Sequence, residues 1–584
     1  MSERKPKSAT GCLIVIVVLI LLLMAPLALL WLFVRGLEGE RVSVRGGTVL
    51  EIDLEAVSGE GPSGLDLGAL FGQAPLSLFD LGRTIDMAAG DDDIVAIRLV
   101  LRGASMGWAS AEEILARLDA FRGAGKPIHA LLEGDILDDL TYFLATAADR
   151  VWVAPATAAA INGLAIETPF FRGTLDKLHI EPEVIMLGDY KSAGEPFVNH
   201  EMSPYMRESM GAVLDTMHDR FIARVSERRG RQPAEVEDTL LGTLLTAQQM
   251  VAAGLADDIG YLDQLGAALI EDAGVEEYRS VTAAEYRAAA RGGSSGAGRD
   301  RIALVFGEGP VVTEAPPSPL PFFESRVLAG ARIAEHFHDA IEDDSIKAIV
   351  FRVSSPGGSA VGSDMVRRAV EEARAAGKPV VVSMSDVAGS GGYWVAMGAD
   401  AIVAQPTTIT GSIGVVFTKM NFDGFLEWLG TNLERIVTAP GADALGFGPL
   451  EESEKQAILA WMNEVYDQFT GHVAAGRNLD LARVREIARG RVWSGRDALE
   501  IGLVDRLGGL PEAFAIAKEK AGLDPDRQYP LEIYPRQRTL YETLFDRGTR
   551  APVAAPDRRA ALEEWGRRVT APQVLARAPE IRIR

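Results

Sequence analysis

The first apolar stretch of the chain is long and uncharged. Residues 12–34 carry no charged side chain, and about 20 apolar residues suffice for a helix to cross the roughly 30 Å hydrocarbon layer of a membrane. A cleaved signal peptide is the alternative, but its apolar segment is usually only about 7–15 residues long. We therefore predict a single transmembrane anchor at residues 12–34, preceded by a short segment, residues 1–11.

The charges beside this run indicate its orientation. Arg4, Lys5 and Lys7 precede it, and Arg35 alone follows closely. Because positive charges favour the cytoplasmic side of a membrane, residues 1–11 are expected in the cytoplasm and the large body outside it.

Beyond the anchor, short apolar runs alternate with helical patterns. Ile94–Val100 and Ile346–Arg352 are both predicted to be buried strands. Each is followed by a helical pattern that ends in Ala-Gly-Lys-Pro, at residues 124–127 and 376–379, and a Gly followed by Pro stops a helix. Strands that alternate with helices in this way favour a mainly parallel sheet.

The two series of elements are copies of one another. Further matched segments follow in the same order at an offset of about 250 residues, which is strong evidence of an internal repeat. The matched pairs are the predicted strands 128–132 and 380–383, the segments 148–155 and 399–406, and the segments 253–260 and 501–508.

The repeat predicts how the body is divided into domains. We expect two homologous α/β domains, at residues 45–290 and 301–530, joined by a Gly- and Ser-rich linker at 291–300. Residues 531–584 are rich in Arg, Ala and Pro without a clear apolar period, and are predicted to form a peripheral tail.

Charge and cysteine content narrow the possible functions. The formal net charge of -23 repels phosphate backbones, so no nucleic-acid partner is expected. Cys12 is the one cysteine of the chain, which excludes an intrachain disulfide and cysteine-rich metal sites.

Positions at which the copies differ are better functional candidates than positions that both keep for packing. Gly357 and Gly358 stand opposite Ser105 and Met106, directly after a predicted strand. A Gly pair there lets backbone N–H groups face a ligand, although a plain tight turn explains it as well.

Ser390 is the second difference, because Asp139 stands opposite it when the copies are aligned on Tyr142 and Tyr393. Small neighbours expose a serine hydroxyl at a strand-to-helix turn, as in a nucleophile elbow. The N–H of Gly391, with the Gly357-Gly358 turn, could then form an oxyanion hole. A structural serine in a Gly-rich turn is the alternative.

A nucleophilic serine needs a base. None of the seven histidines lies in a recognisable triad pattern. Lys191 lies in Gly188-Asp-Tyr-Lys-Ser-Ala-Gly-Glu-Pro-Phe, and the matching region of the second copy, residues 438–445, has no lysine. One copy therefore supplies a candidate base and the other a candidate nucleophile.

These segments resemble the long, two-domain form of the signal peptide peptidase A family, from the anchor to about residue 525. The resemblance rests on four motifs: Asp189-Tyr-Lys-Ser with Glu195-Pro-Phe, Ser355-Pro-Gly-Gly-Ser, Ser390-Gly-Gly-Tyr-Trp and Thr410-Gly-Ser-Ile-Gly-Val. Gly389 is a mild departure from the family pattern, since many members have Ala or Ser at this position.

The resemblance implies roles for three residues. Ser390 would be the nucleophile, Lys191 the general base, and Ser412 a helper of the lysine. It also implies a fold of the crotonase and Clp-protease type, and a homotetramer shaped like a bowl. The family is anchored in the bacterial inner membrane with its body on the periplasmic side, where it degrades hydrophobic signal peptides left after secretion.

The chemistry makes further demands. A lysine can act as a base near neutral pH only if burial lowers its pKa by several units. Lys191 and Ser390 should therefore meet at a dry interface between the domains, either within one chain or between protomers. Such a dyad needs no metal and no cofactor. Two other functions stay open: an acyl-CoA enzyme of the crotonase type, and a non-catalytic scaffold for membrane proteins.

Overall fold

The computed structural model describes residues 44–55, 57–62, 76–239, 244–290, 299–316, 326–439, 441–536, 573–577 and 582–583. The predicted anchor at 12–34, residues 1–11, most of the linker and most of the tail lie outside these residues. Within the described ranges, no helix is both long and apolar enough to cross a membrane.

The N-terminal half is built on a six-stranded parallel sheet in the order β10-β5-β3-β2-β1-β11. Its strands are β1 (Thr48–Asp53), β2 (Ile94–Leu101), β3 (Ile128–Leu132), β5 (Arg150–Val153), β10 (Asp258–Ile259) and β11 (Arg279–Thr282). A small separate sheet holds β4 (Ile136–Asp138), β6 (Ala158–Ala160) and β9 (Leu245–Thr246).

The C-terminal half repeats this plan, which confirms two repeated α/β domains. The corresponding order is β22-β18-β17-β15-β12-β23, also parallel. The strands are β12 (Arg301–Glu308), β15 (Ile346–Ser355), β17 (Val380–Gly389), β18 (Ala401–Ala404), β22 (Arg506–Leu507) and β23 (Leu531–Tyr534). The far end of β17 also pairs with β19 (Ile409–Gly411), which pairs with β21 (Val492–Ser494).

The predicted tail boundary at residue 530 needs correction. Leu531–Tyr534 is the edge strand β23, paired in parallel with β12, and Tyr534 is fully buried. The strand therefore belongs to the second domain and occupies the place that β11 has in the first. It was missed because four residues between loops show no periodicity.

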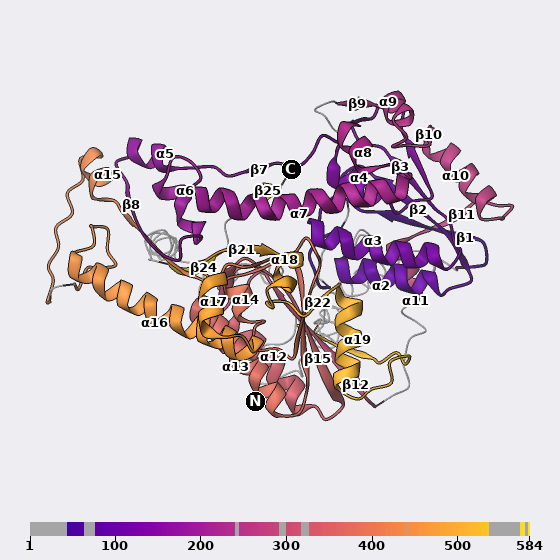
Figure 1. Cartoon of the computed structure of the whole chain (residues 1–584). Helices are drawn as coiled ribbons and strands as arrows, with labels where there is room; N and C mark the ends of the chain where they lie inside the picture. The colour runs from indigo at the N-terminus through magenta and orange to yellow at the C-terminus, as the bar shows by residue number, and fades with distance from the viewer. Residues whose placement is uncertain are drawn as a thin grey trace, which may run out of the picture.

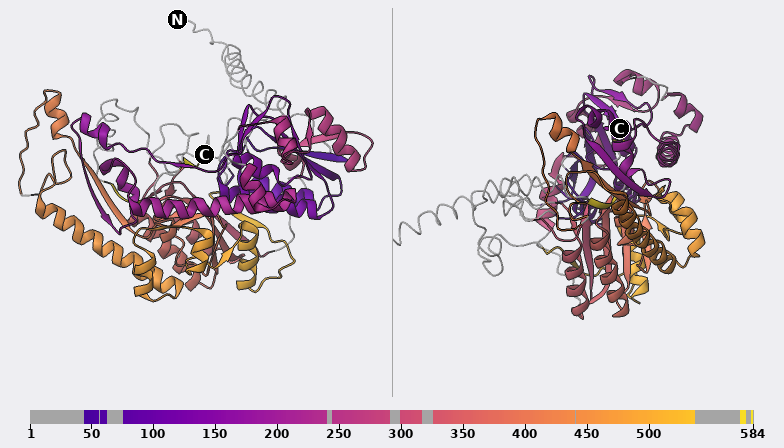
Figure 2. Two further views of the ribbon diagram at one scale, coloured as in Figure 1. Left: turned by 45° about the horizontal axis from the view of Figure 1, so that its top comes forward. Right: turned by 90° about the vertical axis from the view of Figure 1, so that its left-hand side faces the viewer.

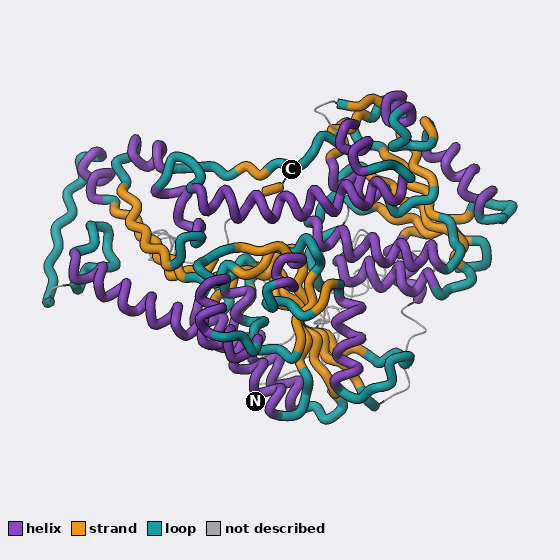
Figure 3. Tube along the Cα trace, viewed as in Figure 1, coloured by secondary structure: helices purple, strands orange, loops and turns teal. Residues whose placement is uncertain are grey.

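Helices cover both faces of the second sheet (Figures 1 and 3). One face packs on α12 (Gly330–Glu342) and α13 (Ala360–Ala375), and the other on α19 (Leu510–Lys520). The strand β15 is accordingly apolar on both faces, with Phe351 in one apolar cluster and Val350 in the other, as expected for a parallel sheet between helices.

The matching Ala-Gly-Lys-Pro corners have a structural explanation. Lys126 Nζ donates to the carbonyl oxygens of Ala88 and Asp91. Lys378 Nζ donates in the same way to Ala340 and Asp343. In each half the lysine caps the C-terminal end of the helix that comes before the matched strand, α2 (Leu78–Ala89) before β2 or α12 before β15, where cations are favoured.

The remaining helices also occur largely in pairs. Two 26-residue helices, α7 (Pro204–Arg229) and α16 (Glu452–Arg477), are the long magenta and orange helices of Figure 2. The other elements are α3 (Trp108–Gly123), α4 (Asp139–Ala145), β7 (Ile166–Glu167), α5 (Arg172–Lys177), the 3-10 turn Ser192–Gly194, α6 (Glu195–Val198), α8 (Pro233–Thr239), α9 (Ala247–Ala252), α10 (Leu262–Asp272), α11 (Ala283–Ala290), β13 (Val311–Val312), β14 (Leu328–Ala329), β16 (Gly357–Gly358), α14 (Gly391–Trp394), α15 (Asp423–Trp428), α17 (Leu481–Ile487) and α18 (Gly495–Glu500).

A third sheet joins the two halves. β8 (Glu181–Leu187) of the first half pairs antiparallel with β20 (Val415–Asn421) of the second, from Leu187 opposite Val415 to Glu181 opposite Asn421. Because the chain leaves β8 toward Lys191 and enters β20 directly after Ser412, this pairing brings the predicted base and its helper to the same place.

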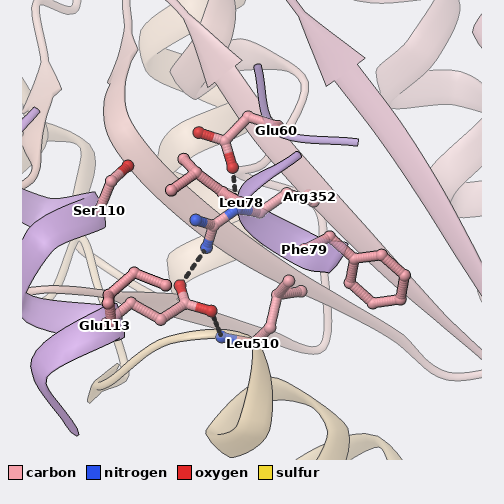
Figure 4. Close-up of a pocket in the computed structure, with 8 residues that line it drawn as sticks. Glu60, Leu78, Phe79, Ser110, Glu113, Arg352 and Leu510 are labelled. Carbon is pink, nitrogen blue, oxygen red and sulfur yellow. Dashed lines mark hydrogen bonds and ion pairs between the residues drawn. The ribbon is translucent and has the colours of Figure 1, made fainter. Parts of the chain in front are cut away.

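Buried charges also lie between the halves (Figure 4). Arg352 of β15 is 2% exposed and contacts Glu60 at 2.9 Å and Glu113 at 3.0 Å, both from the first half. Its guanidinium also donates to Ser383 of β17 at 2.8 Å. β15 and β17 are the strands that lead to the Gly357-Gly358 turn and to Ser390.

Candidate active site

Ser390 lies on a sharp turn between β17 and the short helix α14. Its backbone has φ 55° and ψ -115°, a strained conformation for a residue with a side chain. The turn is held by the Ser390 N–H, which donates to Gly411 O at 2.7 Å, and by the Ser390 carbonyl, which accepts from Tyr393 and Trp394.

The two glycines that follow Ser390 are required by close packing. A Cβ on Gly391 would lie 2.7 Å from Ser363 Oγ, and one on Gly392 would lie 2.5 Å from the carbonyl oxygen of Ser355. Both separations are shorter than real Cβ contacts, so larger residues would push α14 away from the turn after β15.

Lys191 comes from the first half but is enclosed largely by the second. Its side chain is 2% exposed. A Cβ on Gly490 would lie 2.5 Å from the Lys191 Cα, and one on Gly188 would lie 2.3 Å from the Arg489 carbonyl. Glycines therefore let the two backbones meet closely enough to exclude water from the amine.

The lysine amine has three oxygen neighbours. Lys191 Nζ lies 2.7 Å from Ser390 Oγ, 2.9 Å from the Ser412 carbonyl oxygen and 3.1 Å from Ser412 Oγ. All three distances are within hydrogen-bond range. The two side chains that the sequence paired from opposite copies are thus in direct contact, and Ser412 lies beside them.

Burial alone lowers the pKa of Lys191, to about 7. The neighbouring acids are paired elsewhere. The Glu195 carboxylate accepts hydrogen bonds from the Ser203 N–H and hydroxyl, and Asp189 forms an ion pair with Arg489. Among the described residues no carboxylate pairs with the amine, so the amine is partly neutral near pH 7.

The candidate oxyanion glycines are close together but differ in their hydrogen bonds. The Gly357 N–H donates to Ser355 Oγ at 3.2 Å, so it serves the turn. A Cβ on Gly391 would lie 3.0 Å from the Gly358 nitrogen. The N–H groups of Gly358 and Gly391 are therefore neighbours beside Ser390.

Two of the histidines have carboxylate partners away from Ser390. His129 bonds Asp272 at 2.8 Å and His338 bonds Glu372 at 2.9 Å. Within the described part of the chain, the hydrogen-bond partner of the Ser390 hydroxyl is Lys191. The same residues contain no cluster of His, Cys, Asp and Glu that could hold a metal ion.

One structural element of the site was not predicted from the sequence, the loop Arg489-Gly490-Arg491. The Arg489 carbonyl accepts from the Tyr190 N–H at 2.9 Å, and the Arg491 carbonyl accepts from the Ser412 N–H at 2.7 Å. The Arg491 guanidinium lies over the rings of Tyr190 and Trp493. This loop fixes the segments that carry Lys191 and Ser412.

Sequence comparison relates both halves of the chain to one family. The pattern of Peptidase family S49 matches residues 120–276 and 372–524, one match in each half. The chloroplastic serine protease SPPA of Arabidopsis thaliana is 32% identical over 522 residues, which is 88% of this chain and 75% of the relative.

Two bacterial relatives add to this match. Protease 4 of Salmonella typhi is 32% identical over 485 residues, 80% of this chain and 76% of the relative. A putative signal peptide peptidase SppA of Enterococcus faecium is 35% identical over 182 residues, 31% of this chain and 53% of the relative. With its two repeated domains, the chain belongs to Peptidase family S49 and is a serine peptidase of the long, two-domain form.

Proposed function

We propose that this protein is a membrane-anchored serine endopeptidase that degrades remnant signal peptides after secretion, with Ser390 as nucleophile and Lys191 as general base. The observation that supports this most directly is the 2.7 Å contact between Lys191 Nζ and Ser390 Oγ inside a buried site where the pKa of the lysine falls to about 7.

The three contacts of the amine suit a neutral base. A neutral amine has two N–H donors and one lone pair. The donors fit the carbonyl and hydroxyl oxygens of Ser412, at 2.9 Å and 3.1 Å, which leaves the lone pair for the Ser390 hydroxyl. Ser412 thereby orients the base without giving it a counter-charge.

The reaction then follows from these positions. Ser390 Oγ attacks the peptide carbonyl while Lys191 takes its proton, and the ammonium returns that proton to the leaving amine. Water enters by the reverse sequence and releases the acyl group from Ser390. The developing oxyanion would be held by the N–H groups of Gly358 and Gly391, with Gly357 shaping the turn.

The peptide-binding region is formed by two strands. β16 carries Gly357-Gly358, and β20 begins directly after the segment that carries Ser412. An extended peptide that pairs with such strand edges is recognised through its backbone. This suits a protease that must accept many different hydrophobic signal peptides, and the Enterococcus relative is itself named a putative signal peptide peptidase.

A serine-directed fluorophosphonate tests the chemistry. Detergent-solubilised protein should be labelled and should hydrolyse a hydrophobic peptide, and Ser390→Ala should abolish both. A non-catalytic scaffold would not be labelled. A crotonase-type enzyme would turn over acyl-CoA thioesters and would not depend on Lys191.

The cellular setting is part of the same proposal. Residues 12–34 would anchor the protein in the bacterial inner membrane, with the body on the periplasmic side and four copies in the assembly. Protease added to intact spheroplasts should digest the body, and sedimentation in detergent should give a tetramer. A body that is digested only in inverted vesicles would refute the orientation.

A further inference from the structure

One arginine outside the candidate dyad is bonded to the segment that supports the nucleophile. Arg491 follows Gly490 in the loop before β21, and its carbonyl oxygen accepts the Ser412 N–H at 2.7 Å. The carbonyl of the same Gly411-Ser412 peptide group accepts the Ser390 N–H, also at 2.7 Å. A single peptide plane therefore lies between the Arg491 backbone and the nucleophile, and it is held from both sides.

The side chain of Arg491 reaches the segment that carries the base. Its Cζ lies 5.0 Å from the ring centre of Tyr190, the neighbour of Lys191, and 4.3 Å from that of Trp493. A terminal nitrogen of the guanidinium donates to Glu208 of α7 at 2.6 Å, and the Tyr190 hydroxyl donates to the same carboxylate at 3.0 Å. The guanidinium thus contacts two rings and has a carboxylate at its end.

The rings should contribute more to this attachment than the carboxylate does. The Glu208 side chain is 53% exposed, and an ion pair with such a carboxylate stabilises little because water and salt screen it. The Arg491 side chain is only 20% exposed, and its Nε is buried without a hydrogen-bond partner among the described residues. A planar guanidinium in this setting is held mainly by stacking on aromatic faces.

The stacked side chain holds the loop against Lys191. Gly490 has φ 80°, and a Cβ there would lie 2.5 Å from the Lys191 Cα, so the two backbones are in close contact. Because a glycine has more conformational freedom than any other residue, its neighbours must keep it in place. The pair that Arg489 forms with Asp189 is exposed, whereas Arg491 is stacked and half-buried.

The Lys191 amine depends on this cover, because nearby charges do not set its state. The charged groups near Lys191 come from its own segment, from the loop and from α7, and each has a partner: Asp189 with Arg489, Glu208 with Arg491, and Glu195 with the Ser203 hydroxyl. Burial is the cause of the lowered pKa of Lys191. Water that entered beneath the loop would therefore act directly on the amine.

We propose that Arg491 is a positioning residue, whose stacked guanidinium holds the loop closed over Lys191 and keeps water from its amine. This inference rests on the function proposed above, in which Lys191 is the general base. Without the stack the loop would loosen and the amine would be hydrated. The pKa of Lys191 would then rise toward the ordinary value of a lysine, and less of the amine would be neutral at pH 7.

The pH dependence of kcat/KM for a hydrophobic peptide tests this inference. In Arg491→Ala the midpoint of the rise with pH should move up by at least about one unit, so activity near pH 6 should fall at least about tenfold. Activity near pH 10, where the amine is mostly neutral in both proteins, should change little. This pattern differs from a general loss of structure, which lowers kcat/KM at every pH.

Arg496→Ala is the matched control. Arg496 of α18 also links the second half to α7, through Asp219 at 2.9 Å, about three turns along the helix from Glu208. Figure 1 shows α7 running past both β21 and α18. The control therefore loses an arginine and an ion pair to the same helix while the stack stays intact, and its midpoint should equal that of the wild type.

Two changes at Tyr190 separate the stack from the charges. Tyr190→Phe keeps the ring and loses only the hydrogen bond to Glu208, so its midpoint should stay in place. Tyr190→Leu removes the ring but leaves Glu208 paired with Arg491, and its midpoint should rise as in Arg491→Ala. All shifts should persist at about 1 M NaCl, where the Debye length is about 3 Å. A shift that vanishes in salt would be the work of an unpaired Glu208 and would overturn the inference.

The outcomes also separate this inference from the proposed function. An equal loss of kcat/KM at every pH in Arg491→Ala, with an unmoved midpoint, would overturn the positioning role and leave Lys191 as the base. A wild-type profile that does not rise near pH 7 would overturn the base and this inference with it. If circular dichroism shows that Arg491→Ala is unfolded, the Tyr190 pair decides, and equal midpoints for Tyr190→Phe and Tyr190→Leu would overturn the inference.

Discussion

One substitution at Ser412 should raise the pKa of Lys191 and so return the amine to its charged form. The Ser412 hydroxyl lies 3.1 Å from Lys191 Nζ, so Ser412→Asp places a carboxylate beside the amine. Ser412→Asn is the matched control, with the same shape and no charge. Both side chains suit the backbone there, because Ser412 has φ 52° and Asn and Asp are the residue types that adopt positive φ most readily.

The expected shift follows from Coulomb's law. Two unit charges about 4 Å apart attract by about 4 kcal/mol at an effective dielectric constant near 20. Because one pKa unit corresponds to about 1.36 kcal/mol, the carboxylate should raise the pKa of Lys191 by about three units. Starting from about 7, the lysine of Ser412→Asp would titrate near its ordinary value and be almost fully protonated at neutral pH.

The pH profile of kcat/KM measures this shift, since it reports the groups of the free enzyme. At pH 7 the neutral fraction of Lys191 falls from about one half to about one thousandth, so Ser412→Asp should be several hundredfold slower than Ser412→Asn. Its activity should return as the pH rises toward 10. If both variants rise through the same pH, the charge of Lys191 does not limit the reaction and the base lies elsewhere.

Three further changes test the site and the interface. Lys191→Arg keeps the positive charge, but the guanidinium cannot give up its proton at any working pH. Turnover should therefore fall at least about a thousandfold, while the circular dichroism spectrum stays unchanged. A folded variant with near wild-type turnover would refute Lys191 as the base. Gly490→Ala should lower kcat at least tenfold, because its Cβ would lie 2.5 Å from Lys191. Gly377→Ala is the control and should not lower kcat: Gly377 has φ 78°, close to the 80° of Gly490, but no heavy atom lies within 4 Å of its added Cβ. Equal losses of kcat would mean that backbone strain alone is responsible. Arg352→Met leaves the buried Glu60 without its cation and leaves Glu113 with Arg117, and it should lower the free energy of unfolding in urea by about 3–5 kcal/mol. An unchanged midpoint would show that the interface does not depend on this cluster.

The fold could be predicted from the sequence because the two copies keep the same residues where these are needed for packing. The corners at Lys126 and Lys378 cap equivalent helices. Tyr142 and Tyr393, used to align the copies, donate to the equivalent carbonyls of Leu255 and Leu503. The same offset of about 250 residues places β11 opposite β23, so continuing the repeat past residue 530 would have found this strand.

Only those parts of the site that depend on particular side chains could be predicted from the sequence. Ser390 and Lys191 stood out because each is present in one copy only. The Arg489-Gly490-Arg491 loop acts through two backbone carbonyls, which any residue possesses, so no residue type marks it. The pairing of β8 with β20 joins segments more than 200 residues apart, and local patterns of polarity do not show which distant strands meet.

Asp139 shows how the two copies became different. It stands where the second half has Ser390, and burial raises its pKa to about 6. Its carboxylate accepts the Gly163 N–H at 3.2 Å, so in the first half this position holds a loop in place and carries no nucleophile.

The proposed base, Lys191, is shielded from water by the other half of the chain. Lys191 leaves the first half on β8, but the chain that covers it belongs to the second: a Cβ on Gly490 would strike Lys191, and one on Gly414 would lie 2.9 Å from the Leu187 carbonyl. Since burial is the cause of the lowered pKa, the amine can serve as the proposed base only where the two halves pack together. The reactivity proposed for Ser390 therefore depends on the contact between the halves as well as on the two side chains.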